Sequence, residues 1–138
     1  MAMYGQGVTR GKVAMLGIEA ATNQACVAFF PTNGLRSEFL YYFFEYKYEY
    51  IRNLGHGANQ KNLSAEILKG MTIAYPQSVD EQDDIVEKLN SVNHKLALHG
   101  RRHAALSDLF RTLLHQLMTA QVRVNDLDLS VLQSAVAA

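Results

Sequence analysis

The chain has few of the features that mark secreted, membrane-bound or disulfide-linked proteins. Its 138 residues include a single cysteine, so no disulfide can form within the chain. No apolar run approaches the roughly 18 to 20 residues of a membrane span, and no charged and then apolar leader precedes a cleavage site. We therefore expect a globular domain in the cytoplasm. The lone Cys26 lies in the apolar run ACVAFF and is interpreted as a buried small hydrophobe.

An excess of charge of either sign is also lacking. Thirteen Lys and Arg residues balance thirteen Asp and Glu residues over the whole chain. Residues 1–78 carry seven cations against five acids, and residues 79–138 carry six against eight. So mild an asymmetry gives no basic footprint typical of nucleic-acid binding. Any contact with nucleic acid must come from local clusters, such as Arg10 with Lys12.

Known catalytic and cofactor motifs are missing as well. The glycine-rich stretch GQGVTRGK does not match a P-loop, because its Gly-Lys pair is wrongly spaced and is followed by Val13 instead of Ser or Thr. It fails the dinucleotide fingerprint too. No GxSxG or CxxC motif occurs, and a group of acids at residues 80–84 fits the start of a helix without acid or base chemistry. We expect no enzymatic activity, no cofactor and no metal.

Up to Pro76, the sequence contains both strand-like and helix-like patterns. The apolar segments KVAMLGI (12–18), ACVAFF (25–30) and MTIAY (71–75) are typical of strands bounded by turn residues. Between them, residues 37–55 carry aromatic and aliphatic residues at helical spacing and predict one amphipathic helix ending at Gly55. Its tyrosines could stack on bases, although aromatic residues at this spacing more commonly fill a core. A shorter helix follows, capped by Asn62 or Ser64.

After Pro76, the pattern is that of one long helix. Ser78 and Glu81 form a capping box at its start, and no proline interrupts the residues that follow. Apolar residues then recur at alternating steps of four and three over more than four heptads, which predicts a coiled-coil seam. A helix of 40 residues is roughly 60 Å long and needs a partner. The predicted interface consists of Ile85, Leu89, Val92, Leu96, His99, His103, Leu106, Phe110, Leu113 and Leu117.

The centre of this seam is polar. His99 and His103 occupy two consecutive seam positions and flank Gly100, which lowers helix propensity. A polar layer costs stability but specifies register. The alternative is a metal site, which two histidines four residues apart could begin, but no Glu lies between them and no third ligand follows nearby. If the layer is buried in an interface, protonation at mildly acid pH should weaken that interface.

Five separated segments together resemble a known family. In order, they are YGQGVTRGKVAMLGIEAATNQACVAFFP, FLYYFF, GHGANQKNLSAEILKGMTIAYP, EQDDIVEKLN and LLHQLMTAQVRV. They are similar to the specificity subunit of type I restriction-modification systems over residues 3 to about 127. The family's hinge of two prolines followed by Glu-Gln is represented here by Pro76 and Glu81-Gln82, without the second proline.

The resemblance implies an α+β fold, in which a partial target-recognition domain of short strands and helices precedes a long coiled-coil helix. The expected organisation is a partial recognition domain at 1–77, the conserved helix at 78–120 and a tail at 121–138. A family recognition domain has many residues before the YGQG strand, so we expect a C-terminal fragment or a product of an internal start codon. Strand edges and apolar surface left open would then be covered by a partner.

Two functions of different class are compatible with this pattern. The first is recognition of duplex DNA without catalysis, with methyltransferase and restriction subunits as partners and a homodimer formed through the long helix. The second is an interaction or regulatory fragment that docks on methyltransferase or specificity subunits without binding DNA. For the first, polar and cationic residues of two glycine-containing loops are the expected DNA contacts. They are Thr9, Arg10, Lys12, His56, Asn59, Gln60 and Lys61.

Overall fold

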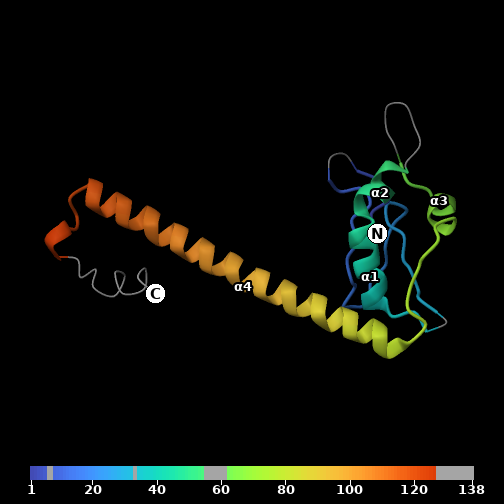
Figure 1. Ribbon diagram of the computed structural model, residues 1–138. Coiled ribbons are helices and arrows are strands. Elements are labelled where there is room, and N and C mark those ends of the chain that lie inside the picture. Colours follow the sequence, from blue (N-terminus) through green and yellow to red (C-terminus); the bar gives the residue numbers. More distant parts are fainter. Residues whose placement is uncertain (6–7, 33, 55–61, 127–138) are drawn as a thin grey trace. The chain divides into compact units, whose positions relative to one another are not determined.

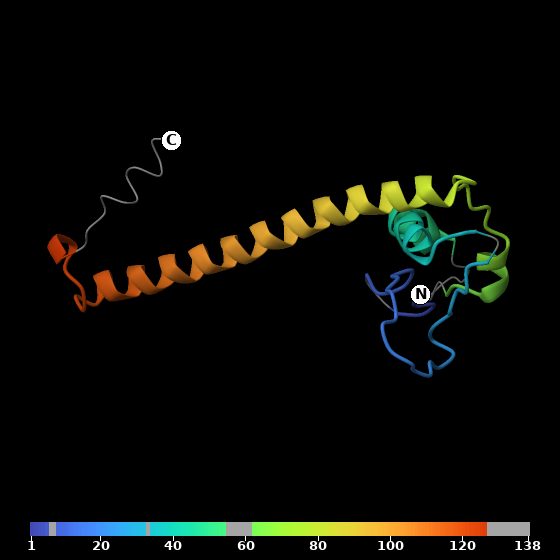
Figure 2. The ribbon, with the colours of Figure 1, turned by 90° about the horizontal axis from the view of Figure 1, so that it is seen from below.

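The computed structural model describes residues 1–5, 8–32, 34–54 and 62–126 (Figures 1 and 2). The helices in these residues are α1 (Ser37–Tyr46), α2 (Tyr48–Asn53), α3 (Ala65–Lys69), α4 (Val79–Met118) and the short 3-10 helix η1 (Val124–Asp126). The chain forms two compact units, Met1–Ser91 and Val92–Ala138. The division falls inside α4, because the first turns of this helix pack within the N-terminal unit.

Strand pairing is much weaker than the sequence predicts. In the described part of the chain, the β structure consists of isolated bridge residues, and Ala2 and Cys26 form an antiparallel bridge with each other. Residues 1–3 bind both neighbouring segments: the Ala2 N–H donates to the Lys12 carbonyl oxygen at 2.9 Å, and the Met3 N–H to that of Ala25 at 2.8 Å. The predicted strands 12–18, 25–30 and 71–75 form no ladder among the described residues. Apolar patterning favours an extended backbone, but a ladder also requires a continuous partner strand.

Cys26 corrects a second prediction, because it is exposed and not buried. The segment around it is extended, so successive side chains point to opposite sides. Val27 and Phe29 are half-buried against the core, whereas Cys26 and Phe30 point the other way, and Phe30 is 85% exposed. Only alternate residues of this apolar run therefore pack on the core.

The core of the N-terminal unit is formed around α1 and α2. The single helix predicted for residues 37–55 is divided at Lys47, whose backbone leaves the helical region at ψ 4°. The preference for a core role of the aromatic residues holds for Phe44, which is buried with its ring centroid 4.6 Å from that of Phe29. The buried apolar cluster comprises Met3, Leu40, Phe44, Ile51, Leu63 and Leu68.

Serine caps begin the last two α-helices. Of the two candidates for α3, Ser64 is the cap, since its hydroxyl accepts a hydrogen bond from the Ile67 N–H at 3.3 Å. The Ser78 hydroxyl accepts from the Glu81 N–H at 3.3 Å, as the capping box predicts for α4. α4 ends after Met118, where Ala120 takes a left-handed conformation with φ 55°. This closing turn lies at the end predicted from sequence.

Gln82 joins the start of α4 to the rest of the N-terminal unit, where α1 lies beside the first turns of α4 (Figures 1 and 2). Its side chain is completely buried. The amide nitrogen donates to the carbonyl oxygens of Gly34 at 2.9 Å and Pro76 at 2.8 Å, and the amide oxygen accepts from the Arg36 N–H at 2.8 Å. Both donor positions and one acceptor position of the amide are therefore used.

An exposed ion pair lies next to this buried amide. The Arg36 guanidinium contacts the Asp83 carboxylate through two hydrogen bonds of 2.9 and 2.7 Å. This hydrogen bonding, and then the charge of Asp83, raises the pKa of Arg36 above its ordinary value. Because both side chains are about half exposed, the pair contributes little to stability by comparison with Gln82. The buried amide is thus the main polar link at this junction.

We predict that Gln82→Leu destabilises the N-terminal unit by about 3 kcal/mol, because it leaves three partly buried backbone groups without their partner. Gln82→Glu should be at least as damaging, since a carboxylate cannot donate to the two carbonyl oxygens. Chemical denaturation followed by the tyrosine signal measures this unit specifically, because all seven tyrosines lie between residues 4 and 75. The control is Gln77→Leu at an exposed position. Equal stability of the Gln82 and Gln77 variants would contradict the role assigned to Gln82.

Candidate nucleic-acid interface

The glycine-rich loop near the start of the chain is shaped by two left-handed glycines. Gly5 has φ 125°, and a Cβ atom there would lie 2.9 Å from the Cβ of Thr9. Gly11 has φ 83° and is buried against α2, with Ile51 and Tyr48 close to the position that a Cβ would occupy. These backbone conformations strongly favour glycine. The glycines therefore serve the fold of the loop.

α2 holds this loop through two hydrogen bonds. The Tyr48 hydroxyl donates to the Val8 carbonyl oxygen at 2.5 Å. The Arg10 guanidinium donates to the Arg52 carbonyl oxygen at 3.1 Å. The Arg52 guanidinium lies 6.0 Å from the centroid of the Tyr48 ring, within reach of a cation–π contact. Residues 8–12 are consequently fixed on one side by a helix whose Ile51 is fully buried.

The three predicted DNA contacts of this loop have different surroundings. Thr9 and Lys12 are exposed and are joined by a tight turn, in which the Lys12 N–H donates to the Thr9 carbonyl oxygen at 3.1 Å. Arg10 is half-buried and directs its guanidinium to α2. A hydroxyl and an ammonium group on one rigid turn can both donate to a phosphate oxygen. Thr9 and Lys12 are therefore the exposed donors of this turn, and the Arg10 guanidinium is held against α2.

Sequence reasoning missed two exposed tyrosines, Tyr46 at the end of α1 and Tyr50 on α2. It treated the aromatic residues of 37–55 together, whereas Tyr46 is 79% exposed and Tyr50 is also exposed. The Lys47 ammonium lies 4.7 Å from the centroid of the Tyr46 ring. The available signal was the close spacing of Tyr with Lys and Arg over residues 46–52. Arg52 follows Tyr48 by four residues, a separation that brings side chains together on a helix.

The second predicted cluster, His56, Asn59, Gln60 and Lys61, lies outside the described residues. Its flanks are described and are anchored to the first loop and its strand. Before it, the backbone nitrogen of Arg52 lies 3.7 Å from the Cβ position of Gly11. After it, the Leu63 N–H donates to the Met3 carbonyl oxygen at 3.1 Å. The described residues Arg52 and Leu63 therefore lie beside Gly11 and Met3, respectively.

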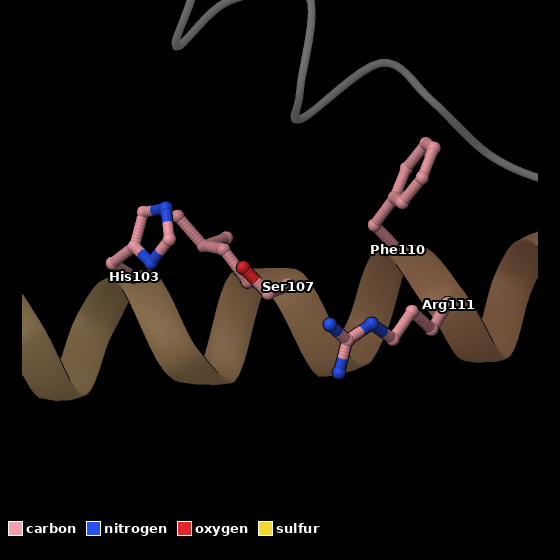
Figure 3. Close-up of a pocket in the computed structure, with 5 residues that line it drawn as sticks. His103, Ser107, Phe110 and Arg111 are labelled. Atoms are coloured by element: carbon pink, nitrogen blue, oxygen red, sulfur yellow. The ribbon is translucent and has the colours of Figure 1, made fainter.

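The ten predicted seam residues all lie on α4. In the second unit, Val92, Leu96, His99, His103, Leu106 and Phe110 are exposed, and Leu96 and Phe110 reach 68% and 66%. His103 and Phe110, two turns apart, project from the same side of the helix (Figure 3). A shallow hollow there is lined by His103, Leu106, Ser107, Phe110 and Arg111. An apolar stripe of this length on an exposed helix marks an interaction surface.

Two further classes of site were sought in the described residues. No group of three or more His, Cys, Asp or Glu side chains there could hold a metal ion. No helix of this part is long and apolar enough to cross a membrane.

Comparison with known proteins identifies the family. Residues 3–108 match the model of the type I restriction modification DNA specificity domain. The chain is 32% identical over 102 residues to the Type I restriction enzyme MjaIX specificity subunit of Methanocaldococcus jannaschii. This alignment covers 64% of the chain and 24% of the relative, so the chain matches about a quarter of that protein's length. No solved structure matches significantly. Because the family model covers well over half of the sequence, the chain belongs to the type I restriction-modification DNA specificity family.

Proposed function

We propose that the chain is a non-catalytic DNA-recognition module of a type I restriction-modification system, acting in the cytoplasm. The observation that carries this proposal is the family match together with the rigid, exposed turn of Thr9 and Lys12 on α2. Such a turn can hold hydrogen-bond donors against phosphates and base edges, and this fixes the position of the protein along the duplex. Cleavage and methylation then belong to restriction and methyltransferase subunits, with which the module assembles.

The module pairs with a second copy through α4 in antiparallel orientation. The seam supports this orientation, because a two-fold axis at residue 101 gives five matched layers on each side. His99 then meets His103, so polar residues face polar residues and the remaining layers are apolar. A small Val92 also lies opposite a large Phe110. The layers are Ile85 with Leu117, Leu89 with Leu113, Val92 with Phe110, Leu96 with Leu106 and His99 with His103, one residue of each pair coming from each copy.

The same axis brings the Gly100 residues of the two copies close together on one flank of the seam. In the single chain, nothing lies within 4 Å of a Cβ placed at Gly100. A glycine in the middle of a helix costs about 1 kcal/mol relative to Ala, so its presence needs a compensating contact. Close approach of the two helix backbones at this crossing supplies one. Because α4 begins within the N-terminal unit, an antiparallel pair carries one reading domain toward each end.

A second candidate function is docking on methyltransferase or specificity subunits without DNA binding. The exposed apolar residues of α4 favour it equally, because a seam partner can be a helix of another subunit. The two candidates differ in their dependence on salt. Phosphate contacts release counterions, so DNA binding weakens steeply as the salt concentration rises, whereas apolar helix docking does not.

We predict that the full chain binds duplex DNA with an affinity that falls as salt rises, and that Lys12→Gln weakens this binding about tenfold, the value of one charged hydrogen bond. Lys12 is exposed, so its replacement should leave thermal stability unchanged. Arg10→Gln should instead lower stability by about 1 kcal/mol, since the bond to the Arg52 carbonyl is lost. Fluorescence anisotropy at several salt concentrations measures the affinity.

Lys69→Gln is the matched control, because Lys69 is an exposed cation at the end of α3. An unaltered affinity of Lys12→Gln would remove the loop from the DNA interface. If the wild-type chain showed no salt-dependent binding to duplex DNA, the recognition function would be rejected and docking would be the remaining function.

We predict that the chain is a dimer at neutral pH, with twice the 15.4 kDa mass of one chain, and that it dissociates near pH 5. In the pair, protonated His99 and His103 would face each other beside Arg102, and no acid lies between Glu87 and Asp108 to compensate them. A dry interface disfavours charged imidazoles, so the dimer binds fewer protons than the separate chains and acid favours separation. Light scattering at both pH values measures the mass.

The variant His99→Leu/His103→Leu should remain dimeric at both pH values, whereas His94→Leu, off the seam, should behave like the wild type. Leu96→Gln/Phe110→Gln should be monomeric throughout. A monomeric wild-type chain at neutral pH would contradict self-pairing and indicate that α4 awaits another subunit.

A further inference from the structure

The cations of α4 are concentrated in its middle. The first nine residues of the helix contain five acids, but residues 88–107 contain none. The same twenty residues contain Lys88, Lys95, Arg101 and Arg102, and all four of these cations are exposed. This part of the helix therefore carries four positive charges over about 30 Å with no acid of its own to offset them.

Three of these cations share one heptad position. Lys88, Lys95 and Arg102 are spaced by seven residues and directly precede the seam residues Leu89, Leu96 and His103. They thus flank the seam along one side. Among the described residues, the ion pairs are Arg36 with Asp83 and Arg111 with Asp108, so none of the three is paired with an acid. Coiled coils usually match such flanking cations with Glu.

The other flank of the seam contains no charge. The residues that directly follow the seam positions 85, 92, 99, 106 and 113 are Val86, Asn93, Gly100, Ser107 and Leu114. In an antiparallel pair, equivalent flanks of the two helices meet on the same side of the interface. The neutral flanks then form one face of the pair, and both cationic flanks form the opposite face. No acid of the second copy reaches the cations.

We propose that this face, with Lys88, Lys95 and Arg102 of both copies, is a binding surface for the phosphate backbone of the duplex between the two sites read by the paired domains. The proposal rests on the recognition function and the antiparallel pair given above. We call the six side chains the cationic row. Successive levels lie about 10.5 Å apart, and the row spans about 40 Å, slightly more than one turn of B-DNA.

Charge complementarity favours DNA as the occupant. The row crosses the two-fold axis at Arg102, where the guanidinium groups of the two copies come close together. Their repulsion destabilises the pair, and a bound anion reduces that repulsion. A duplex offers phosphates on both strands all along this length, at regular spacing and without sequence preference. Such contacts position the protein but do not read bases, which leaves sequence reading to the loops of the N-terminal unit.

The test compares the row variant Lys88→Gln/Lys95→Gln/Arg102→Gln with the control Arg101→Gln/Arg111→Gln/Arg123→Gln. The control removes the same number of exposed cations from positions outside the row. The full chains are titrated against a duplex of about 40 base pairs of arbitrary sequence at several salt concentrations. If all six row cations contact phosphate, the slope of log affinity against log salt should become shallower by about 5 in the row variant. The control should change it by less than about 1.

The oligomeric mass, measured on the same samples, separates the possible failures. The row variant should remain a dimer, because its seam is intact and the Arg102 repulsion is removed. Equal slopes for wild type, row variant and control would overturn the row while leaving recognition by the loops intact. Dissociation of the row variant would also overturn it and would indicate an acidic protein helix as the occupant. No salt-dependent binding by the wild type would instead reject the recognition function on which the row depends.

Discussion

The buried amide of Gln82 is the contact on which the N-terminal unit and the use of α4 both depend. It ties the turn at Gly34, the backbone of Arg36 and the carbonyl of Pro76 to the first turn of one helix. Packing within the unit continues at Val86, which is buried, and at Asn90, which accepts a hydrogen bond from the Tyr42 hydroxyl at 2.6 Å. Residues 82, 86 and 90, which contact the unit, are each four residues apart, whereas the seam residues alternate between steps of four and three. Attachment to the unit therefore uses one stripe of α4 and leaves the seam residues from Val92 to Phe110 exposed.

In the glycine-rich loop, some residues maintain the fold and others are exposed, and residue type alone does not distinguish the two groups. A loop with three glycines and two cations suggests phosphate binding, yet two of its glycines are required by positive φ and close packing. Its arginine is turned toward the helix that supports it. What remains for a ligand is the exposed pair Thr9 and Lys12. Rigidity comes from Gly11 and Tyr48, and a rigid turn loses less entropy on binding than a flexible one.

The elements best predicted from sequence were those specified by local chemistry. The capping box at Ser78, the cap at Ser64 and the long uninterrupted helix all depend on residues close in sequence, so their signals are self-contained. The strands were not reproduced as ladders, because pairing depends on segments that a local pattern cannot identify. The break at Lys47 and the burial of Gln82 were missed for a similar reason. Gln82 is polar, and only its distant partners Gly34 and Arg36 explain why it is buried.

The recognition of the family and the physical pattern of α4 contribute different information. The family match states what kind of protein this is, but it does not explain why the seam has histidines at its centre or why one flank lacks acids. The proposed antiparallel pairing accounts for the histidines, because they lie at the midpoint of the ten seam positions and would meet each other in such a pair. A helix selected only to remain hydrated would mix charges of both signs along its surface. Here the acids occupy the first turns, where the helix dipole favours them, and the cations are left uncompensated beside the seam. This separation of acids from cations fits the two roles proposed for α4. Its apolar seam binds a partner helix, and the cations on one face attract an anionic ligand.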